Sequence, residues 1–295
     1  MQQIAAIVVT YNRKEMLYAC ISKLLQQKPC TCDVLVIDNG STDGTEAYIC
    51  SKISHPSVIY HNTGKNLGGA GGFSAGIQLA FQMGYSYIWL MDDDTYVEKN
   101  SLEELLEADQ RLNGNYGFLS SIAYWKDGTI CNMNRQHTSL RGRLNNFSSP
   151  QVPVKMASFV SFWIKREVIE SVGLPISEFF IWSDDLEYSR RISMQYPCYA
   201  VPSSKVLHNM VSNSKVGIEQ DSLDRLWRYT YLYRNEVYVY RREGLKGWLY
   251  LWARVLLHSY RVLATGTSKS KKIRIIWHSF FSGFHFHPPI KYVKM

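Results

Sequence analysis

The stretch YIWLMDDDTY, residues 87–96, places three consecutive aspartates directly after a run of apolar residues. Neighbouring carboxylates repel one another, and at the end of a buried segment they are costly unless a cation meets them. One interpretation is a solvated turn whose charges favour the N-terminus of a helix in EKNSLEELLEA, residues 98–108. The other is a metal site in which Asp92 and Asp94 bind Mg²⁺ or Mn²⁺, because hard divalent cations prefer oxygen ligands. The position after an apolar strand favours the metal site.

Earlier parts of the chain repeat the same arrangement of an apolar run followed by a helical segment. The runs, including the one above, are residues 4–10, 33–38, 57–62 and 86–92. This alternation predicts an α/β fold with a mostly parallel central sheet flanked by helices. Ligands of such sheets bind at the carboxyl ends of the strands. Those ends carry Thr10-Tyr11-Asn12, Asp38-Asn39-Gly40, Asn62 and Asp92-Asp93-Asp94, so we expect the site along this edge.

The remaining two thirds of the chain follow a different pattern. Shorter apolar stretches fill the region from residue 116 to 220, and the polar insert 132–150 is expected to be a long mobile loop. From residue 221 the pattern is helical, with helices predicted in 221–243 and 245–264. We therefore predict a catalytic domain over residues 1–220, with parts 1–115 and 116–220, and a helical C-terminal region over 221–295.

Charge is distributed unevenly along the chain. Residues 241–295 contain eleven of the 33 Lys and Arg residues but only one acid, Glu243, so this tail carries +10 and the first 240 residues −2. A basic surface spread over the whole fold is absent, which argues against nucleic acid as a partner. The six cysteines include no CxxC pair and are expected to be reduced thiols. The start of the chain lacks a basic leader pattern, so we expect no targeting segment.

A second acidic cluster lies in FFIWSDDLEYSRRIS, residues 179–193. One interpretation is a capped amphipathic helix, with Asp184 as the cap and Glu187 as its capping-box partner. The other makes Asp185 a general base that faces an acceptor hydroxyl, which requires a carboxylate within reach of the proton it removes. Trp182 beside it would then stack on a sugar ring.

Two further features gain weight only if the metal site is real. His208 follows the apolar segment KVL; a lone histidine there is more often a core residue than a ligand, but imidazole can complete a Mn²⁺ shell. The segment NTGKNLGGAGGFSAG, residues 62–76, is rich in glycine, so its backbone can approach a phosphate or sugar at a helix N-terminus. It is neither a Walker loop nor a dinucleotide fingerprint, because no GK[ST] follows and it comes after the third strand.

Seven stretches, in this order, together resemble the family 2 inverting glycosyltransferases, and within them the galactofuranosyltransferase and rhamnosyltransferase branch. They are IVVTYNRKEML, VLVIDNGSTDGT, NLGGAGGFSAGI, WLMDDDTY, FFIWSDDLEYSRR, VLHN and YLYRNEVY. The resemblance covers residues 4 to about 240 and implies a GT-A fold. It assigns nucleotide-sugar binding to residues 1–115, and catalysis and acceptor binding to residues 116–220.

The resemblance also implies a role for individual residues. Asp185 would be the catalytic base, and Asp92, Asp94 and His208 would hold Mn²⁺ or Mg²⁺. The donor, a UDP-sugar, would be bound by Thr10, Tyr11, Arg13, Asp38, Asn39, Asn66, Gly68, Gly69 and Asp93. Sugar and acceptor contacts would come from Trp163, Trp182, Asp184 and Glu187.

The activity implied is metal-dependent, inverting transfer of galactofuranose from UDP-galactofuranose to a bacterial cell-surface glycan such as capsule, O-antigen or cell-wall polysaccharide, carried on a lipid. A rhamnosyltransferase that uses dTDP-rhamnose is the alternative within the class. A non-catalytic nucleotide-sugar-binding subunit of a glycan assembly complex is the alternative outside it, although such a subunit needs no base. A nucleotidyltransferase is a third alternative, but the chain lacks a basic glycine-rich loop after its first strand.

The basic, aromatic C-terminal region adds a partner prediction. Arg254, His258 and Arg261 recur at helical spacing and would form a cationic stripe, followed by the lysines 269, 271 and 272. This pattern is typical of a helix at an anionic membrane interface, which places the protein in the cytoplasm on the inner face of the plasma membrane. The alternative is a helix that packs on the catalytic domain or on a second copy in a homo-oligomer. The sequence HFHPP, residues 285–289, has no neighbours to complete a metal site.

Overall fold

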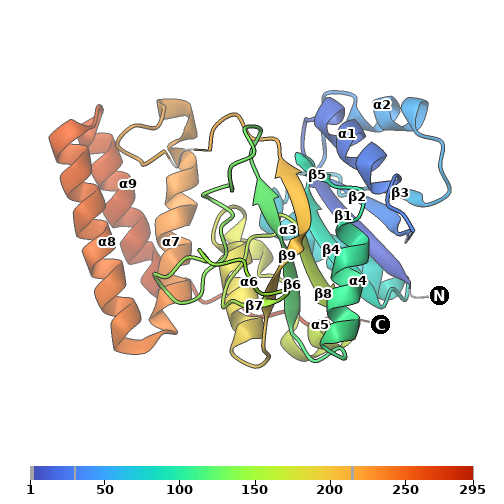
Figure 1. Cartoon of the computed structure of the whole chain (residues 1–295). Helices are drawn as coiled ribbons and strands as arrows, with labels where there is room; N and C mark the ends of the chain where they lie inside the picture. The colour runs from blue at the N-terminus through green and yellow to red at the C-terminus, as the bar shows by residue number, and fades with distance from the viewer. Residues whose placement is uncertain (1–2, 30, 214–215, 295) are drawn as a thin grey trace.

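One half of the central sheet is parallel and carries the predicted strands in order. In the computed structural model, which describes residues 3–29, 31–213 and 216–294, these strands are β1 (Ile4–Thr10), β2 (Asp33–Asp38), β3 (Val58–Asn62) and β4 (Tyr87–Asp92). They lie in the order β3-β2-β1-β4 (Figure 1), and every residue of β1 is buried. Burial on both faces explains why β1, β2 and β4 read as continuous apolar runs, while β3 at the edge of the sheet is only partly buried.

The other half of the sheet is mixed and brings distant segments to the end of β4. Its strands are β5 (Thr95–Val97), β6 (Phe118–Tyr124), β7 (Val152–Pro153), β8 (Phe162–Lys165) and β9 (Tyr199–His208). The order continues β4-β8-β6-β9-β5, with β7 also paired to β9. Because β5 runs antiparallel to β9 with Thr95 opposite His208, the residue after the aspartates lies beside the histidine. The sheet as a whole is mixed and mainly parallel, as predicted.

Helices cover both faces of the sheet and divide the core in two. On one face lie α1 (Lys14–Leu24), α2 (Thr45–Lys52) and α4 (Ser101–Arg111), which share a core with Ile4, Ala6 and Val8 of β1. On the other lie α3 (Gly68–Gln82), α5 (Arg166–Val172) and α6 (Asp184–Ser193), which share a second core with Ala5, Ile7 and Val9. The alternation along β1 therefore serves two cores.

A third core joins the C-terminal helices to the catalytic part. It contains side chains of α7 (Trp227–Arg241), α8 (Gly244–Thr265) and α9 (Lys269–Ser282), together with Phe179 from the short helix η1 (Ser177–Phe179). Figure 1 shows the three helices together at one end of the molecule, with α7 between α8 and the sheet. Short 3₁₀ helices η2 (Leu223–Arg225) and η3 (Gly283–His285) flank the bundle, and α9 is a helix that the sequence pattern did not predict.

After η3 the chain returns to the catalytic part, across the boundary predicted at residue 220. The carbonyl of Lys291 accepts a hydrogen bond from the backbone of Leu174 at 2.8 Å. The Gln78 side chain bonds both the backbone carbonyl and the backbone amide of Lys294, at 2.9 and 3.1 Å. The division at residue 220 stays a prediction, and these contacts tie its two sides together.

Three other expectations can be compared with the described residues. The insert 132–150 contains no helix or strand, but Gln136, His137 and Leu144 within it are buried, so it is packed against the body. Five cysteines are free thiols, and Cys30 lies outside the described residues. Among the helices of residues 3–29, 31–213 and 216–294, none is long and apolar enough to cross a membrane.

Glycines in α3 allow this helix to lie close to the sheet. A Cβ added at Gly76 would be 2.6 Å from Ile7 Cγ2 and 2.9 Å from Ile37 Cγ1, and one at Gly72 would be 2.6 Å from Val9 Cγ1. At Gly69, by contrast, an added Cβ would meet nothing within 4 Å. Much of the glycine content predicted to approach a ligand therefore serves close helix–sheet packing.

We expect Gly76→Ala to lower the free energy of unfolding. Overpacking costs about 1–3 kcal/mol, and the better helix propensity of alanine returns only ~1 kcal/mol of it. Urea unfolding followed by circular dichroism measures the difference. Gly69→Ala in the same helix is the matched control, with no loss of stability expected; an equal loss in both variants would contradict the packing argument.

Candidate active site

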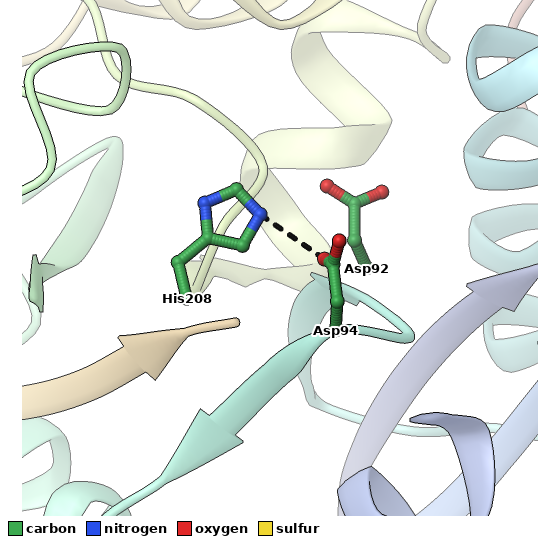
Figure 2. A group of neighbouring side chains, drawn as sticks. All are labelled: Asp92, Asp94 and His208. Carbon is green, nitrogen blue, oxygen red and sulfur yellow. Dashed lines mark hydrogen bonds and ion pairs between the residues drawn. The ribbon is translucent and has the colours of Figure 1, made fainter. Parts of the chain in front are cut away.

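The end of β4 holds a three-residue cluster suited to a divalent cation. One ligand atom each from Asp92, Asp94 and His208 lies within 4.8 Å of the other two. Figure 2 shows the two carboxylates and the imidazole directed at a common space, with His208 Nε2 3.0 Å from Asp94 Oδ1. Two carboxylates and an imidazole form a donor set that fits Mn²⁺ or Mg²⁺. The aspartates end before β5, and α4 begins only at Ser101, so they do not form that helix's first turn.

The insert 132–150 contributes a residue that orients the histidine. Asn134 Oδ1 accepts a hydrogen bond from His208 Nδ1 at 2.7 Å, while its amide nitrogen donates to Ser158 Oγ at 3.0 Å. Because Nδ1 carries the proton in this arrangement, Nε2 is the atom presented to Asp94 and to a cation. Such a partner fixes both the tautomer and the ring direction of a metal-binding histidine. Asn134 lies in an irregular polar segment, and nothing in the sequence around it predicts that it belongs to the site.

The cluster is electrostatically strained without a cation. Burial, then the neighbouring Asp94, raises the pKa of Asp92 to about 7, although His208 opposes the shift. Burial would lower the pKa of His208, but hydrogen bonds to Asp94 and Cys131 and the charges of Asp94 and Asp92 together outweigh it and raise the pKa to about 9. At neutral pH His208 therefore carries a second proton, on Nε2, in addition to the one on Nδ1. A cation bound at Nε2 must displace that second proton. Metal affinity accordingly falls as the pH drops below about 9.

Asp93 points away from this cluster and binds residues at the end of β1. Its carboxylate accepts hydrogen bonds from Thr10 Oγ1 at 2.7 Å and from Arg13 at 3.2 Å, and the same guanidinium reaches Asp94 at 3.0 Å. Burial raises the pKa of Asp93 to about 6 despite the opposing charge of Arg13. The side chain of Arg13 is 51% exposed, so a cationic group remains at the mouth of the site.

The other residues predicted to bind the donor lie along the same sheet edge, and several are held by the protein itself. Asp38 accepts hydrogen bonds from Ser41 and Tyr60, while Asn39 donates to the carbonyl of Gly68 at 2.9 Å. Asn66 Oδ1 accepts from the amide of Gly68, at the start of α3, at 2.8 Å. Tyr11 is exposed at the end of β1, and Gly69 borders open space. These contacts shape the strand ends and the N-terminus of α3.

The second acidic pair follows a strained turn. Phe180, Trp182 and Ser183 have positive φ angles of 62°, 65° and 67°, which non-glycine residues seldom adopt. Asp184 and Asp185 then begin α6, so Asp184 is not the helix cap. Burial, then Asp185, raises the pKa of Asp184 well above its usual range, with a smaller contribution from Asp92. Strain of this kind is concentrated at functional sites and needs support from the surrounding structure.

A single asparagine in the C-terminal region supports that turn. Asn235 of α7 is fully buried, and its amide nitrogen lies 3.0, 3.2 and 2.9 Å from the carbonyl oxygens of Phe179, Ile181 and Trp182. Arg234 adds a hydrogen bond to the carbonyl of Glu178 at 2.7 Å. The motif YLYRNEVY contains both residues, and a polar Asn-Glu pair in an aromatic helix was the signal that could have revealed them.

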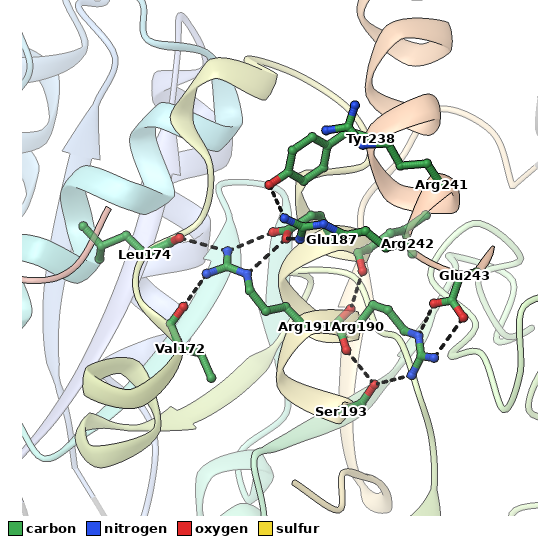
Figure 3. Close-up of polar contacts among 12 residues, drawn as sticks. Val172, Leu174, Glu187, Arg190, Arg191, Ser193, Tyr238, Arg241, Arg242 and Glu243 are labelled. Atoms are coloured by element: carbon green, nitrogen blue, oxygen red, sulfur yellow. Dashed lines mark hydrogen bonds and ion pairs between the residues drawn. The ribbon is translucent and has the colours of Figure 1, made fainter. Parts of the chain in front are cut away.

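Two predicted substrate residues are corrected by the structure. Trp163 is fully buried in β8, where its indole donates to the hydroxyl of Tyr116 at 2.9 Å, so it cannot form a wall for the donor sugar. Glu187 is 3% exposed and pairs with Arg191 at 2.8 Å and Arg242 at 3.0 Å, as Figure 3 shows. Its carboxylate therefore joins α6 to the end of α7 and is neither a capping-box residue nor a sugar ligand.

Trp182 and Asp185 keep positions compatible with their predicted roles. Trp182 is half-buried, and its ring meets Tyr229 edge-on at a centroid distance of 5.1 Å. Asp185 is less buried than Asp184, which leaves part of it accessible from solvent. The structure thus brings together at one edge the three-residue cluster, the Asp93–Arg13 pair and the acidic start of α6.

The sheet order, the acidic strand end and the second acidic pair define a GT-A glycosyltransferase. Among solved structures, mannosyltransferase PcManGT from Pyrobaculum calidifontis, in complex with GDP-Man and Mn²⁺, matches with a TM-score of 0.60 and 16% identity, covering 97% of this chain and 76% of that one. S. aureus TarS matches with a TM-score of 0.57 and 14% identity over 97% of this chain, which spans only 44% of the TarS chain. Both likenesses concern the fold.

The chain belongs to glycosyl transferase family 2, whose model matches residues 5–173. It is 24% identical over 293 residues to galactofuranosyltransferase GlfT1 of Mycolicibacterium smegmatis, covering 85% of this chain and 90% of that protein. It is 36% identical over 109 residues to undecaprenyl-phosphate mannosyltransferase of Micrococcus luteus, covering 36% of this chain and 44% of that protein. The protein is thus a glycosyltransferase, and an inverting reaction is consistent with its family.

We expect Asn134→Ala to weaken Mn²⁺ binding by about 10- to 100-fold, because the imidazole of His208 loses the partner that fixes its tautomer. Calorimetric titration of the protein with MnCl₂ measures the effect without any sugar substrate. Asn134→Asp retains an acceptor for Nδ1 and should keep most of the affinity. Equal affinities for the wild type and Asn134→Ala would contradict the orienting role.

We expect Asn235→Leu to lower kcat by about 10- to 100-fold through misplacement of the acidic pair. Three carbonyl groups also lose their donor, which should lower the free energy of unfolding by about 2–4 kcal/mol. Steady-state kinetics below the unfolding temperature, together with Mn²⁺ titration, separate the two effects. Mn²⁺ affinity should stay unchanged, since Asn235 does not contact the metal cluster; an unchanged kcat would contradict the prediction.

Proposed function

We propose that this glycosyltransferase transfers galactofuranose from UDP-galactofuranose to a lipid-linked bacterial cell-surface glycan, in a reaction that requires Mn²⁺ or Mg²⁺. The observation that carries the proposal is the pair of acidic groups at one sheet edge in a chain that aligns over most of its length with galactofuranosyltransferase GlfT1. Within the branch, dTDP-rhamnose is the competing donor. We place the reaction at the inner face of the plasma membrane, in the cytoplasm, where nucleotide sugars and a lipid-linked acceptor can meet.

The metal fits this site because its donor atoms converge and their negative charges are only partly compensated by Arg13 and His208. Asp92, Asp94 and His208 would hold it, and a bound cation would offset the charge that develops on the departing diphosphate. Arg13 stands beside Asp93 and Asp94 with half of its side chain exposed, so it supplies a second positive charge for the donor. Thr10 keeps Asp93 turned toward Arg13 and away from the cluster.

Asp185 is the proposed base. Both members of the acidic pair lie in the first turn of α6, where the helix dipole favours negative charge. The raised pKa of the more buried Asp184 favours a proton on that carboxyl, so the pair avoids two adjacent negative charges. Asp185 then accepts the proton of the acceptor hydroxyl as that oxygen attacks the anomeric carbon, which inverts the configuration. Trp182 provides an aromatic surface next to this position.

We expect turnover of UDP-galactofuranose, and not of dTDP-rhamnose, when a panel of nucleotide sugars is incubated with the protein and Mn²⁺. Chelation with EDTA should abolish it, and Asp185→Asn should lower kcat by about 10²- to 10⁴-fold through loss of the base. The product nucleotide, resolved by liquid chromatography, gives the rate. Asp127→Asn, at an exposed turn, is the matched control.

The outcomes separate the parts of this proposal. Preference for dTDP-rhamnose would show that the proposed donor is wrong, while the proposed class of reaction would stand. Full activity after EDTA treatment would overturn the metal requirement. An Asp185→Asn enzyme as fast as the wild type with a complete acceptor would remove Asp185 from the mechanism.

A further inference from the structure

The outward side of α8 carries an unusual row of exposed apolar residues, here called the α8 face. Its members recur every three or four positions and are 39% to 75% exposed: Leu245, Leu249, Trp252, Leu256, Tyr260 and Leu263. This spacing places all six on one side of the helix. A contiguous exposed apolar row along a whole helix marks an interaction surface, because soluble monomers rarely expose one.

The opposite side of α8 shows why this row faces outward. Leu251, Val255 and Val262 are buried against the neighbouring helices, and the partly buried Arg254 forms an ion pair with Glu236 at 2.7 Å. His258 Nδ1 lies 2.8 Å from the hydroxyl of Tyr233. Arg254 and His258 of the predicted cationic stripe therefore face the bundle, which corrects the sequence expectation. Apolar residues thus lie on both sides of α8, and those of the α8 face are the ones left uncovered.

Aromatic residues of α9 and η3 extend the same surface. Trp252 contacts Trp277 and Phe280, with ring centroids 6.2 and 4.9 Å apart. Phe281 and Phe284 continue from there and are 51% and 38% exposed. The apolar surface therefore spans two adjacent helices.

Charge decides between the possible occupants of this surface. Exposed cations accompany it, among them Lys246, Arg261, Lys271 and Arg274. The one acid after residue 240, Glu243, pairs with Arg190. A second copy docked face to face would bring two cationic rims together. A surface of anionic lipid headgroups complements both the cations and the apolar row.

We propose that the α8 face, continued by Phe281 and Phe284, is a docking surface for an anionic phospholipid bilayer. The helix lies in the plane of the interface, because its apolar row runs along all 22 residues, roughly 33 Å. Leucine and aromatic side chains enter the boundary between headgroups and acyl chains, while Lys246 and Arg261 remain at headgroup level. The inference takes from the proposed function only the choice of a cellular membrane as partner.

Flotation of the full chain with vesicles tests this inference without any sugar transfer. The vesicles contain phosphatidylcholine alone or with a third of phosphatidylglycerol, in 0.1 or 0.5 M NaCl. The wild type should float with the anionic vesicles and bind less at high salt or to neutral lipid. The double variant Leu249→Glu/Leu256→Glu should lose binding at least tenfold.

Matched controls keep the result specific. Met83→Glu/Met194→Glu introduces the same charges at exposed apolar positions outside the α8 face and should float as the wild type does. Nucleotide-sugar hydrolysis in detergent-free buffer and circular dichroism should be the same for all three proteins. A face variant that keeps hydrolysis but loses flotation supports the docking surface, and absence of hydrolysis in every protein would instead count against the proposed function.

Three results would overturn the docking surface. Failure to recover the wild type with anionic vesicles would exclude the bilayer as the partner of this surface. Flotation of the face variant equal to that of the wild type would exclude it as well. A stable wild-type dimer by light scattering that the face variant converts to monomers would assign the surface to a second copy. Equal binding to neutral and anionic vesicles would remove the electrostatic part of the inference.

Discussion

The end of β4 brings Asp92, Asp93 and Asp94 together where burial disfavours their charges. Several other parts of the fold place groups beside them that offset these charges. Thr10 and Arg13 at the end of β1 engage Asp93, and the pairing of β5 with β9 delivers His208 to Asp94. Even so, the pKa of Asp92 remains raised to about 7 by burial and by Asp94. Thr10, Arg13 and His208 offset part of this charge, and Asp92, Asp94 and His208 form a donor set suited to a divalent cation.

The C-terminal helices support the candidate active site as the sheet does. The family model ends at residue 173, before the strained turn and the acidic pair that follows it. That turn is held by Asn235, and α6 is joined to the end of α7 through the pairs of Glu187 with Arg242 and of Arg190 with Glu243. Both pairs involve a carboxylate with little exposure, which is costly to leave without its partner, so they fix α6 relative to the helices.

Sequence reasoning succeeded where chemistry is local and failed where a partner is distant. The strands 4–10 and 33–38 were predictable from apolar, β-branched runs, and the two aspartates of the metal cluster from their position at a strand end, whereas His208 joined them through the family resemblance. The family resemblance assigned Trp163 to substrate binding. Nothing in the neighbouring sequence shows that its side chain is buried and hydrogen-bonded to Tyr116. The predicted sugar contact of Glu187 was wrong for the same reason, since its partner Arg242 is 55 residues away.

The helical region shows a second limit. Periodicity identified α8, but it could not tell which side of the helix would be covered, because Arg254 and His258 find Glu236 and Tyr233 only after folding. The helix α9 mixes lysines with apolar residues and begins directly after a short irregular segment, so its pattern is weak. Asn134 had no signal in its sequence neighbourhood, and the polar Asn-Glu pair that marks Asn235 does not show which backbone groups it binds, because the partners of both residues lie far along the chain.

The return of the C-terminal tail to Leu174 and Gln78 sets the order in which the protein can be completed during synthesis. A nascent chain emerges from the ribosome with its N-terminal strands first, and domains fold as units once their residues are available. The sheet edge that carries the aspartates after β4 is synthesised early, whereas α7 and the segment that returns to Leu174 emerge after it. The turn before Asp185 therefore stays without its clamp until Asn235 of α7 has left the ribosome.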